Sequence, residues 1–417
     1  MPASYDIEIS LRALRDIVGN VKKRRNAAAD GLIDVLLCLV DHFEPQVGGA
    51  AADIADCRLN AWLDQYPKIA DRHRDADERR PAHSFFYPWD EYRREEMAPL
   101  QAMCAQGYGE IEIHLHHRDD TEATLRAKLE DAIAEFRAIG ALSCWPFPTP
   151  TGPHAGPSSD RAACPYGGRM AGKPAFGFIH GNWALDNSRQ EKGRNFCGVN
   201  SEIRLLHDLG CYADFTFPAW QHTAQPRITN AIYYATDDPE APKSHDRGTR
   251  AKVGASEVGD LLLVQGALVP YLQGLKRGDR PAMDDSDLAF YRRYAPARAD
   301  RWIGAAVHVE GCGSRVFVKL HCHGAAERNC ECLLGSDLDE MFTDLEARYN
   351  DGTHYRLHYV TAREMFNIIR ATELDPSITV EAARDYLLKP PAQPVNLEAD
   401  GFMQPVVAGG EAAARRA

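Results

Sequence analysis

The sequence predicts an α/β protein organised as an irregular (β/α) barrel, and three observations favour this fold class. Units of a strand followed by a helix recur along the chain, which is typical of parallel sheets. Residues 35–40 form a continuous apolar run, as in a strand buried on both faces. Histidines and carboxylates follow several predicted strands at their carboxyl ends, where barrel enzymes carry their active sites. A doubly wound parallel sheet is the alternative arrangement.

The composition indicates a large globular protein and narrows the classes of partner. A length of 417 residues allows one large domain with extensions. The formal net charge of −12 argues against a general affinity for nucleic acid. The start does not resemble a secretory signal, and no apolar run approaches the roughly 18 residues of a transmembrane helix. Eleven scattered cysteines favour reduced thiols, so we expect a cytoplasmic protein without an integral membrane segment.

The chain is expected to divide into an N-terminal helix extension (1–30), the barrel (31–385) and a flexible C-terminal tail (386–417). Residues 10–25 have the spacing of an amphipathic helix, with Ser10 as its cap. We expect one apolar stripe to pack this helix on the body, with a membrane surface as the alternative. The stripe consists of Leu11, Leu14, Ile17, Val18 and Val21.

The remaining elements follow from local patterns in chain order. Helical spacing near 56–74 precedes a short aromatic strand that Pro88 ends, and a helix-like stretch follows near 91–106. After the next strand, Asp119 and Glu122 form a capping-box pattern for a helix that Gly140 stops. A loop rich in Pro, Gly and Ser spans 145–175. Further strands are expected within 175–188, 212–218, 225–248 and 314–325, with a helix at 201–209 and a last strand–helix unit in which Thr361 and Glu364 form a capping box.

The segment EIHLHH (residues 112–117) carries the strongest functional signal. The strand alternates, so Glu110, Glu112, His114 and His116 are expected on one face. Burying four polar side chains without a function is unfavourable, so we predict a metal or catalytic role for this segment.

A divalent metal such as zinc takes nitrogen and oxygen ligands at about 2.0–2.2 Å and keeps a position open for water. His114 and His116 can share an ion, because residues i and i+2 project from the same face of a strand. His117, where the strand gives way to a loop, and His42, at the end of another strand, are the further candidate ligands.

Acid–base chemistry at such a site needs a carboxylate and a second proton donor. Asp41 is the candidate base for a metal-activated water, and His321 or His323 is the candidate general acid. Capping or a local turn is the structural alternative for Asp41 and His42.

Five residues at other strand ends are candidates for contact with a substrate. Trp183 can stack on a sugar ring, or it can act as a wedge between helices. Lys319 is either a substrate contact or the partner of Glu110 or Glu112. For His180, a structural hydrogen bond is the usual alternative role. The complete set is His180, Asn182, Trp183, Asp214 and Lys319.

Five segments together resemble the polysaccharide deacetylases of the NodB-homology (carbohydrate esterase family 4-like) superfamily. They look most similar to its divergent WbmS-like branch among bacterial surface-polysaccharide biosynthesis proteins, and the resemblance covers roughly residues 33–370. The segments, in the family's order, are LCLVDHFEP, GEIEIHLHH, FIHGNW, ADFTFP and VFVKLHCHGA.

The resemblance implies an irregular (β/α) barrel that uses a divalent metal to remove N- or O-linked acetyl groups from sugars. Asp41 matches the family's base, and His42 stands where a metal-binding aspartate is usual. His114 matches the first histidine ligand, while the second would fall on Arg118, so His116 or His117 must replace it. The family's Arg-Pro motif is replaced by residues 180–183, and its histidine acid corresponds to His321, with His323 second.

Three functions are therefore compared. The first is a zinc-dependent deacetylase acting on an acetylated sugar, such as a nucleotide-linked or lipid-linked precursor of a surface polysaccharide. The second is another metal-dependent amidohydrolase, because His-x-His occurs at both 114–116 and 321–323. The third is a catalytically silent carbohydrate-binding or scaffold protein on the same fold.

Overall fold

The computed structural model describes residues 3–27, 31–147, 170–191, 193–255, 259–274 and 280–391. Its main sheet has twelve strands. Along the sheet they run β10 (Gly248–Arg250), β9 (Ile232–Ala235), β11 (Leu261–Val264), β8 (Cys211–Asp214), β5 (Pro174–His180), β3 (Gly109–Leu115), β2 (His83–Pro88), β1 (Ile33–His42), β15 (Arg315–Cys322) and β14 (Asp287–Leu288), with β16 (Tyr355–Tyr359) beside β1 and β4 (Ser143–Cys144) beside β5.

All neighbouring strands are parallel in the run β11, β8, β5, β3, β2, β1, β15 and β14. The other strands β9, β10 and β4 pair with their neighbours in antiparallel orientation. This confirms the predicted α/β class with a largely parallel sheet. β1 is central: its first half pairs with β16, its second half with β2, and its other edge with β15. Among the described residues no strand pairing joins β14 to β10, β9 or β11, so the hydrogen-bonded path is open.

Two small hairpins and ten helices complete the described part of the chain. The hairpins are β12 (Val269–Gln273) with β13 (Arg280–Asp284), and β6 (Gln190–Glu191) with β7 (Arg194–Asn195). The helices are α1 (Ala3–Ala27), α2 (Ala52–Ala70), α3 (Arg94–Met103), α4 (Glu122–Ala138), α5 (Glu202–Leu209), α6 (Pro296–Gly304), α7 (Cys330–Leu333), α8 (Ser336–Tyr349), α9 (Ala362–Leu374) and α10 (Val380–Ala383).

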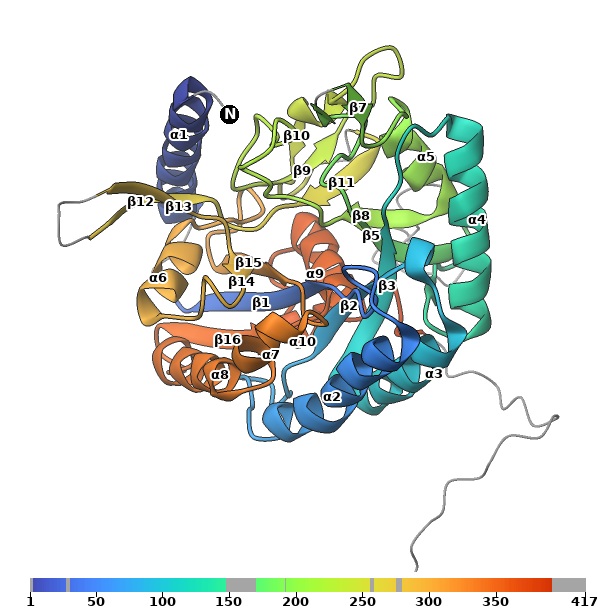
Figure 1. Ribbon diagram of the computed structural model, residues 1–417. Helices are drawn as coiled ribbons and strands as arrows, with labels where there is room; N and C mark the ends of the chain where they lie inside the picture. Colours follow the sequence, from blue (N-terminus) through green and yellow to red (C-terminus); the bar gives the residue numbers. More distant parts are fainter. Residues whose placement is uncertain are drawn as a thin grey trace, which may run out of the picture.

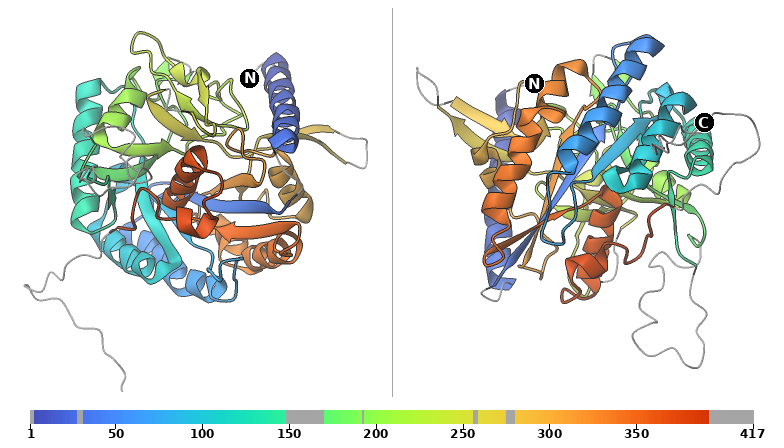
Figure 2. Two further views of the ribbon diagram at one scale, coloured as in Figure 1. Left: turned by 180° about the vertical axis from the view of Figure 1, so that it is seen from behind. Right: turned by 90° about the horizontal axis from the view of Figure 1, so that it is seen from below.

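Helices α2, α3, α4, α5 and α8 lie around the outside of the sheet, whereas α9 is seen inside this ring of helices (Figure 1) and lies at one end of the strands in the view from below (Figure 2). The view from behind shows α9 and α10 in the middle of the surrounding elements (Figure 2). Nearly every residue of α9 from Ala362 to Glu373 is buried, as expected for a helix enclosed on all sides. Its buried Asn367 receives the backbone N–H groups of Leu387 and Leu388, so the chain remains packed to this point.

The structure corrects two predicted helix starts. Ser10 lies inside α1 rather than at its cap. The cap of α4 is Thr121, paired with Thr124, and not Asp119. Asp119 has φ of +52°, which is incompatible with the extended backbone of an N-cap. The capping box of Thr361 and Glu364 on α9 is confirmed.

Helix α1 packs on the body, but not through the predicted stripe. Ile9 and Ala13 are buried against Leu268 and Met283, whereas most of the stripe points to solvent. None of the helices in the described ranges has the length and apolar character needed to cross a bilayer. Most of the predicted loop at 145–175, and residues 392–417 of the predicted tail, lie outside the described residues.

Candidate metal centre

Parallel strands bring their carboxyl ends to one edge of the sheet, and there three side chains form a buried cluster. His42 ends β1, Glu44 follows it, and His114 lies near the end of β3. One possible ligand atom from each of the three lies within 4.8 Å of the others. His42 and Glu44 are two residues apart on extended backbone, which places them on the same side of the chain.

The hydrogen bonds of His114 define how its ring faces this cluster. Its Nδ1 is 3.0 Å from the backbone oxygen of Ile179, an acceptor, so Nδ1 carries a proton. Its Nε2 is 3.0 Å from Glu44 Oε1. Burial lowers the pKa of His114, so the neutral ring would direct a lone pair at a carboxylate. A cation bound between the two groups would remove the repulsion between this lone pair and the carboxylate. A metal-bound histidine usually donates its other ring N–H to a backbone carbonyl or a carboxylate, which fixes the tautomer and the orientation of the ring.

His116 approaches the same carboxylate from the solvent side. Its Nε2 is 3.4 Å from Glu44 Oε1, and its Nδ1 is 3.2 Å from Asp90 Oδ2. Burial lowers the pKa of His116, but the hydrogen bonds to Asp90 and Glu44 outweigh burial and raise it to about 10. Burial likewise opposes ionisation of Glu44, yet His114 and His116 hold its pKa far below the usual range.

Glu44 is the residue of this cluster to which the sequence reasoning assigned no role. The signal was present in the spacing, because Glu44 stands at i+2 from His42. His42 itself has a buried Nδ1 with no hydrogen-bond partner, and burial holds its pKa well below the usual range. Its ring stacks on that of His323, with centroids 4.6 Å apart. The cluster therefore offers carboxylate oxygen and neutral imidazole nitrogen, a donor set that suits a divalent ion such as zinc.

Asp41, the predicted base, faces the opposite side of β1 from His42. Its side chain is fully buried. Oδ1 accepts the backbone N–H of Gly324 at 2.6 Å, and Oδ2 is 2.9 Å from His83 Nε2. Asp41 thus ties the end of β1 to the turn that follows β15, and it lies outside the cluster of His42, Glu44 and His114.

His117 lies in a separate buried cluster with His180, Cys197 and Glu202. Burial lowers the pKa of His117, but Glu202, whose Oε1 is 2.9 Å from His117 Nε2, outweighs burial and raises it to about 9. His180 Nδ1 accepts the backbone N–H of Asn182 at 3.2 Å, so a neutral ring carries its proton on Nε2. Because His180 Nε2 then offers no lone pair, this cluster fits an ion pair between His117 and Glu202 better than a metal.

The remaining predicted contact residues lie at different depths. Asn182 donates to the backbone oxygen of His117 at 2.8 Å and lines the mouth of the site. Asp214 is buried and accepts from the hydroxyl of Thr216 at 2.7 Å, and that hydroxyl also receives the backbone N–H of His180. Burial raises the pKa of Asp214 to about 7.

Lys319 is also buried, beneath the mouth. Its Nζ donates to the backbone oxygens of Phe215 and Phe217, each at 2.6 Å, and burial lowers its pKa to about 7. The alternative prediction for Lys319, an ion pair with a β3 carboxylate, is wrong. Those carboxylates bond elsewhere, Glu110 with Arg363 and Glu112 with Tyr212 and the backbone of Gly177.

Two hollows flank the cluster. A cavity of about 500 Å³ opens beside Glu44 and His116, and Glu91, at the end of the turn η1 (Trp89–Glu91), lines it. Glu91 Oε2 is buried without a hydrogen-bond partner. Burial and the charges of Glu44 and Asp90 raise the pKa of Glu91 to about 7. Sequence reasoning missed Glu91, since nothing in its local pattern marks it.

A smaller hollow of about 120 Å³ lies on the other side of His42. Trp183 has φ of +50° and stands 5.5 Å from His42 and 5.6 Å from His222 between ring centroids. Burial lowers the pKa of His321 to about 3, so its ring is neutral near pH 7. The lining includes aromatic rings, carboxylates and both predicted acids: Trp183, Trp220, Tyr291, Asp285, Asp287, His321 and His323.

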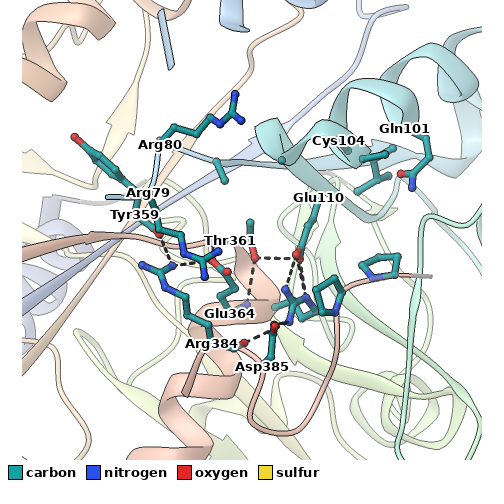
Figure 3. Close-up of a pocket in the computed structure, with 18 of the residues that line it drawn as sticks. Arg79, Arg80, Gln101, Cys104, Glu110, Tyr359, Thr361, Glu364, Arg384 and Asp385 are labelled. Atoms are coloured by element: carbon teal, nitrogen blue, oxygen red, sulfur yellow. Dashed lines mark hydrogen bonds and ion pairs between the residues drawn. The ribbon is translucent and has the colours of Figure 1, made fainter. Parts of the chain in front are cut away.

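A third cavity, of about 480 Å³, lies beside the amino ends of β2 and β3, away from the histidines. Figure 3 shows Glu110, Thr361, Glu364 and Arg384 around it. Thr361 donates to Glu110 at 3.0 Å, Arg363 pairs with Glu110 at 2.7 Å, and Arg384 pairs with Glu364 at 3.1 Å. Because these charges satisfy one another, they anchor α9 to the sheet rather than form a site for chemistry.

These features mark the end of β1 and β3 as the candidate site. No protein-family model and no curated protein matches this chain.

Proposed function

We propose that this protein is a metal-dependent hydrolase that removes an acetyl group from a sugar. The observation that carries the metal part is His114, whose Nδ1 is committed to a carbonyl while Nε2 faces Glu44 at 3.0 Å. His42, Glu44 and His114 would hold the ion, with His116 beside them. Zinc is the ion we expect, because the donors are imidazole and carboxylate.

The sugar and the acetyl group come from the resemblance to polysaccharide deacetylases, which we extend to this chain as part of the proposal. The aromatic and carboxylate lining of the smaller hollow supports a sugar, since rings stack on sugar faces and carboxylates accept from hydroxyls. A contact across the sheet supports the family's irregular barrel, because Lys319 on β15 bonds carbonyls that follow β8, although these strands are not neighbours in the sheet.

A bound divalent ion would polarise the acyl carbonyl and lower the pKa of a water molecule towards neutrality. The protein's own groups would move the protons. Glu91 faces the larger cavity with a free oxygen and a pKa near 7, so we propose Glu91 as the base and Asp41 as a positioning residue. Burial keeps the pKa of His321 at about 3, which disfavours it as the acid, and we propose His323, which stacks on His42 and lines the smaller hollow, to protonate the leaving group.

The first experiment is the metal content of the purified protein, for the wild type and for His114→Ala. His354→Ala is the matched control, because the His354 side chain is 79% exposed and remote from the site. We expect about one equivalent of a divalent ion in the wild type and in the control, and loss of most of it in His114→Ala. An ion that binds equally to all three proteins would contradict the proposed centre.

The second experiment separates the two carboxylates. Acetate release from a panel of N- and O-acetylated sugars identifies a substrate, and the variants are then compared on it. Glu91→Gln should keep the metal and lose about 10²–10⁴-fold in turnover, as for a general base. Turnover of a non-acetyl amide with inert acetyl sugars would favour the other amidohydrolase instead.

A further inference from the structure

Helix α1 carries a second apolar face that the body of the protein leaves uncovered. Ile7, Leu11, Leu14 and Val18 are 61, 63, 45 and 67% exposed. These four are among only ten large hydrophobic side chains classed as exposed in the described residues, so they form a patch rather than a scatter. With the half-buried Val21 they repeat at intervals of four, three, four and three residues, which is the a/d pattern of a coiled-coil seam.

The opposite face fixes the helix, so this seam cannot turn inward. Asn20 Nδ2 donates to the backbone oxygens of Asn230 at 2.8 Å and Ala305 at 3.2 Å. Asp16 accepts the hydroxyl of Thr229 at 2.8 Å, and Lys23 pairs with Glu310. Figure 1 shows α1 at the periphery, beside β12 and β13, where another molecule can reach it.

The width and flanks of the seam select a protein partner over a membrane. At 100° per residue the five side chains span about 80°, which is narrow for a membrane-surface helix and usual for a helix–helix seam. A membrane-surface helix carries lysines and arginines along the edges of its apolar face. Here one edge is mixed in charge, because Glu8, which pairs with Arg12 at 2.6 Å, precedes Arg15 and Lys22 on the same side.

Charge along the seam specifies a second copy of this chain in antiparallel orientation. Glu8 flanks the first half of the seam, while Arg15 and Lys22 flank the same side further on. In an antiparallel pair, Glu8 of one copy faces Arg15 or Lys22 of the other. A parallel pair would instead bring the basic ends of both helices, residues 22–25, together. We propose that two copies of this chain associate through antiparallel packing of α1, independently of the metal centre.

The test is the mass of the full chain in solution, measured by sedimentation velocity from about 1 to 100 μM. We expect a species of twice 46.3 kDa in the wild type and a monomer for Leu11→Glu/Val18→Glu. Both side chains are exposed, so these substitutions leave the fold intact. Ile54→Glu, at an exposed apolar position on α2, is the matched control and should remain dimeric.

Charge reversal tests the orientation. Glu8→Lys and Arg15→Glu/Lys22→Glu should each weaken self-association at least tenfold, because like charges then face each other. An equimolar mixture of the two should form a heterodimer, since one variant is then basic and the other acidic at positions 8, 15 and 22. A wild type that stays monomeric, a dimer that survives Leu11→Glu/Val18→Glu, or a mixture that fails to associate would each overturn the proposal. Monomers that sediment with phosphatidylglycerol vesicles would assign the seam to a membrane instead.

Discussion

Replacing Asp284 is expected to destabilise the protein strongly, although Asp284 lies away from the proposed metal. Asp284 ends β13, and its side chain is 2% exposed. It receives Nε and Nη2 of Arg298, each at 3.0 Å, the guanidinium of Arg301 at 2.9 Å, and the indole N–H of Trp302 at 3.0 Å. All three donors belong to α6, so a single carboxylate holds this helix to the β12–β13 hairpin.

The magnitude follows from the pKa of Asp284. Burial raises it, but the hydrogen bonds and charge of Arg298 outweigh burial and lower it from 3.8 to about 2. A change of this size corresponds to about 2 kcal/mol of folded-state stability. Because the folded pKa is lowered, this contribution is present above about pH 4 and is lost as the pH falls towards 2. Removing the carboxylate also leaves Arg301 without its anion and Arg298 with only Asp287, at 3.4 Å, so we expect Asp284→Asn to lose about 3 kcal/mol at pH 7.

Urea unfolding of the wild type and Asp284→Asn between pH 3 and pH 8 measures this difference. The gap in unfolding free energy should be constant above pH 5 and should narrow below pH 4. Asp64→Asn is the control, because Asp64 pairs with Lys68 on the surface and is 66% exposed; it should change stability by less than about 0.5 kcal/mol. A loss in Asp284→Asn as small as in the control, or a gap that stays constant down to pH 3, would refute the reasoning.

Three further predictions concern other buried polar groups. Asp41→Asn should keep its metal and lose about 1–3 kcal/mol of stability, since one acceptor bond is retained; loss of the ion on inductively coupled plasma analysis would contradict its placement outside the centre. Glu202→Gln should lower the thermal midpoint of unfolding, because the variant loses the negative charge that faces His117, and it should keep the metal content of the wild type. Loss of one equivalent of metal would instead make the cluster of His117, His180, Cys197 and Glu202 a second metal site. Asp34 and Asp77 outweigh burial and raise the pKa of His358, so its stabilising charge is fully present below about pH 6.5 and is lost as the pH rises through the raised value. Denaturation of His358→Gln should therefore approach that of the wild type as the pH rises, and a difference that does not shrink would refute it.

The sequence predicted the parallel sheet because strand–helix units recur along the chain and because residues 35–40 form an apolar run typical of a strand buried on both faces. It also predicted the cap at Thr361, where the motif and the backbone agree. It failed at Asp119, since a left-handed backbone at that residue moves the cap to Thr121. The central position of α9 has no local signal, because an amphipathic helix outside a sheet and an enclosed one begin with the same cap.

The candidate site was predicted in part, and the errors have a physical cause. His42 and His114 lie together, as expected from strand ends that share one edge of the sheet. The alternation of side chains along β1 already separates Asp41 from His42, and Glu44 follows two residues after His42. Asp41 was instead predicted as the base because it is a carboxylate beside His42, and the family pattern agreed with that choice. Glu91 could not be predicted, because its place depends on the turn after β2 meeting the end of β3.

The enclosed position of α9 sets an order on synthesis of the chain. β1 leaves the ribosome roughly 330 residues before α9, a wait of tens of seconds at about 10 residues per second. For most of that time its apolar residues have neither β15 nor β16 beside them, since these strands begin only at Arg315 and Tyr355. The buried neighbours of β1 therefore form only after residues 315–374 have been made, and a product that ends before residue 362 lacks the buried helix α9 altogether.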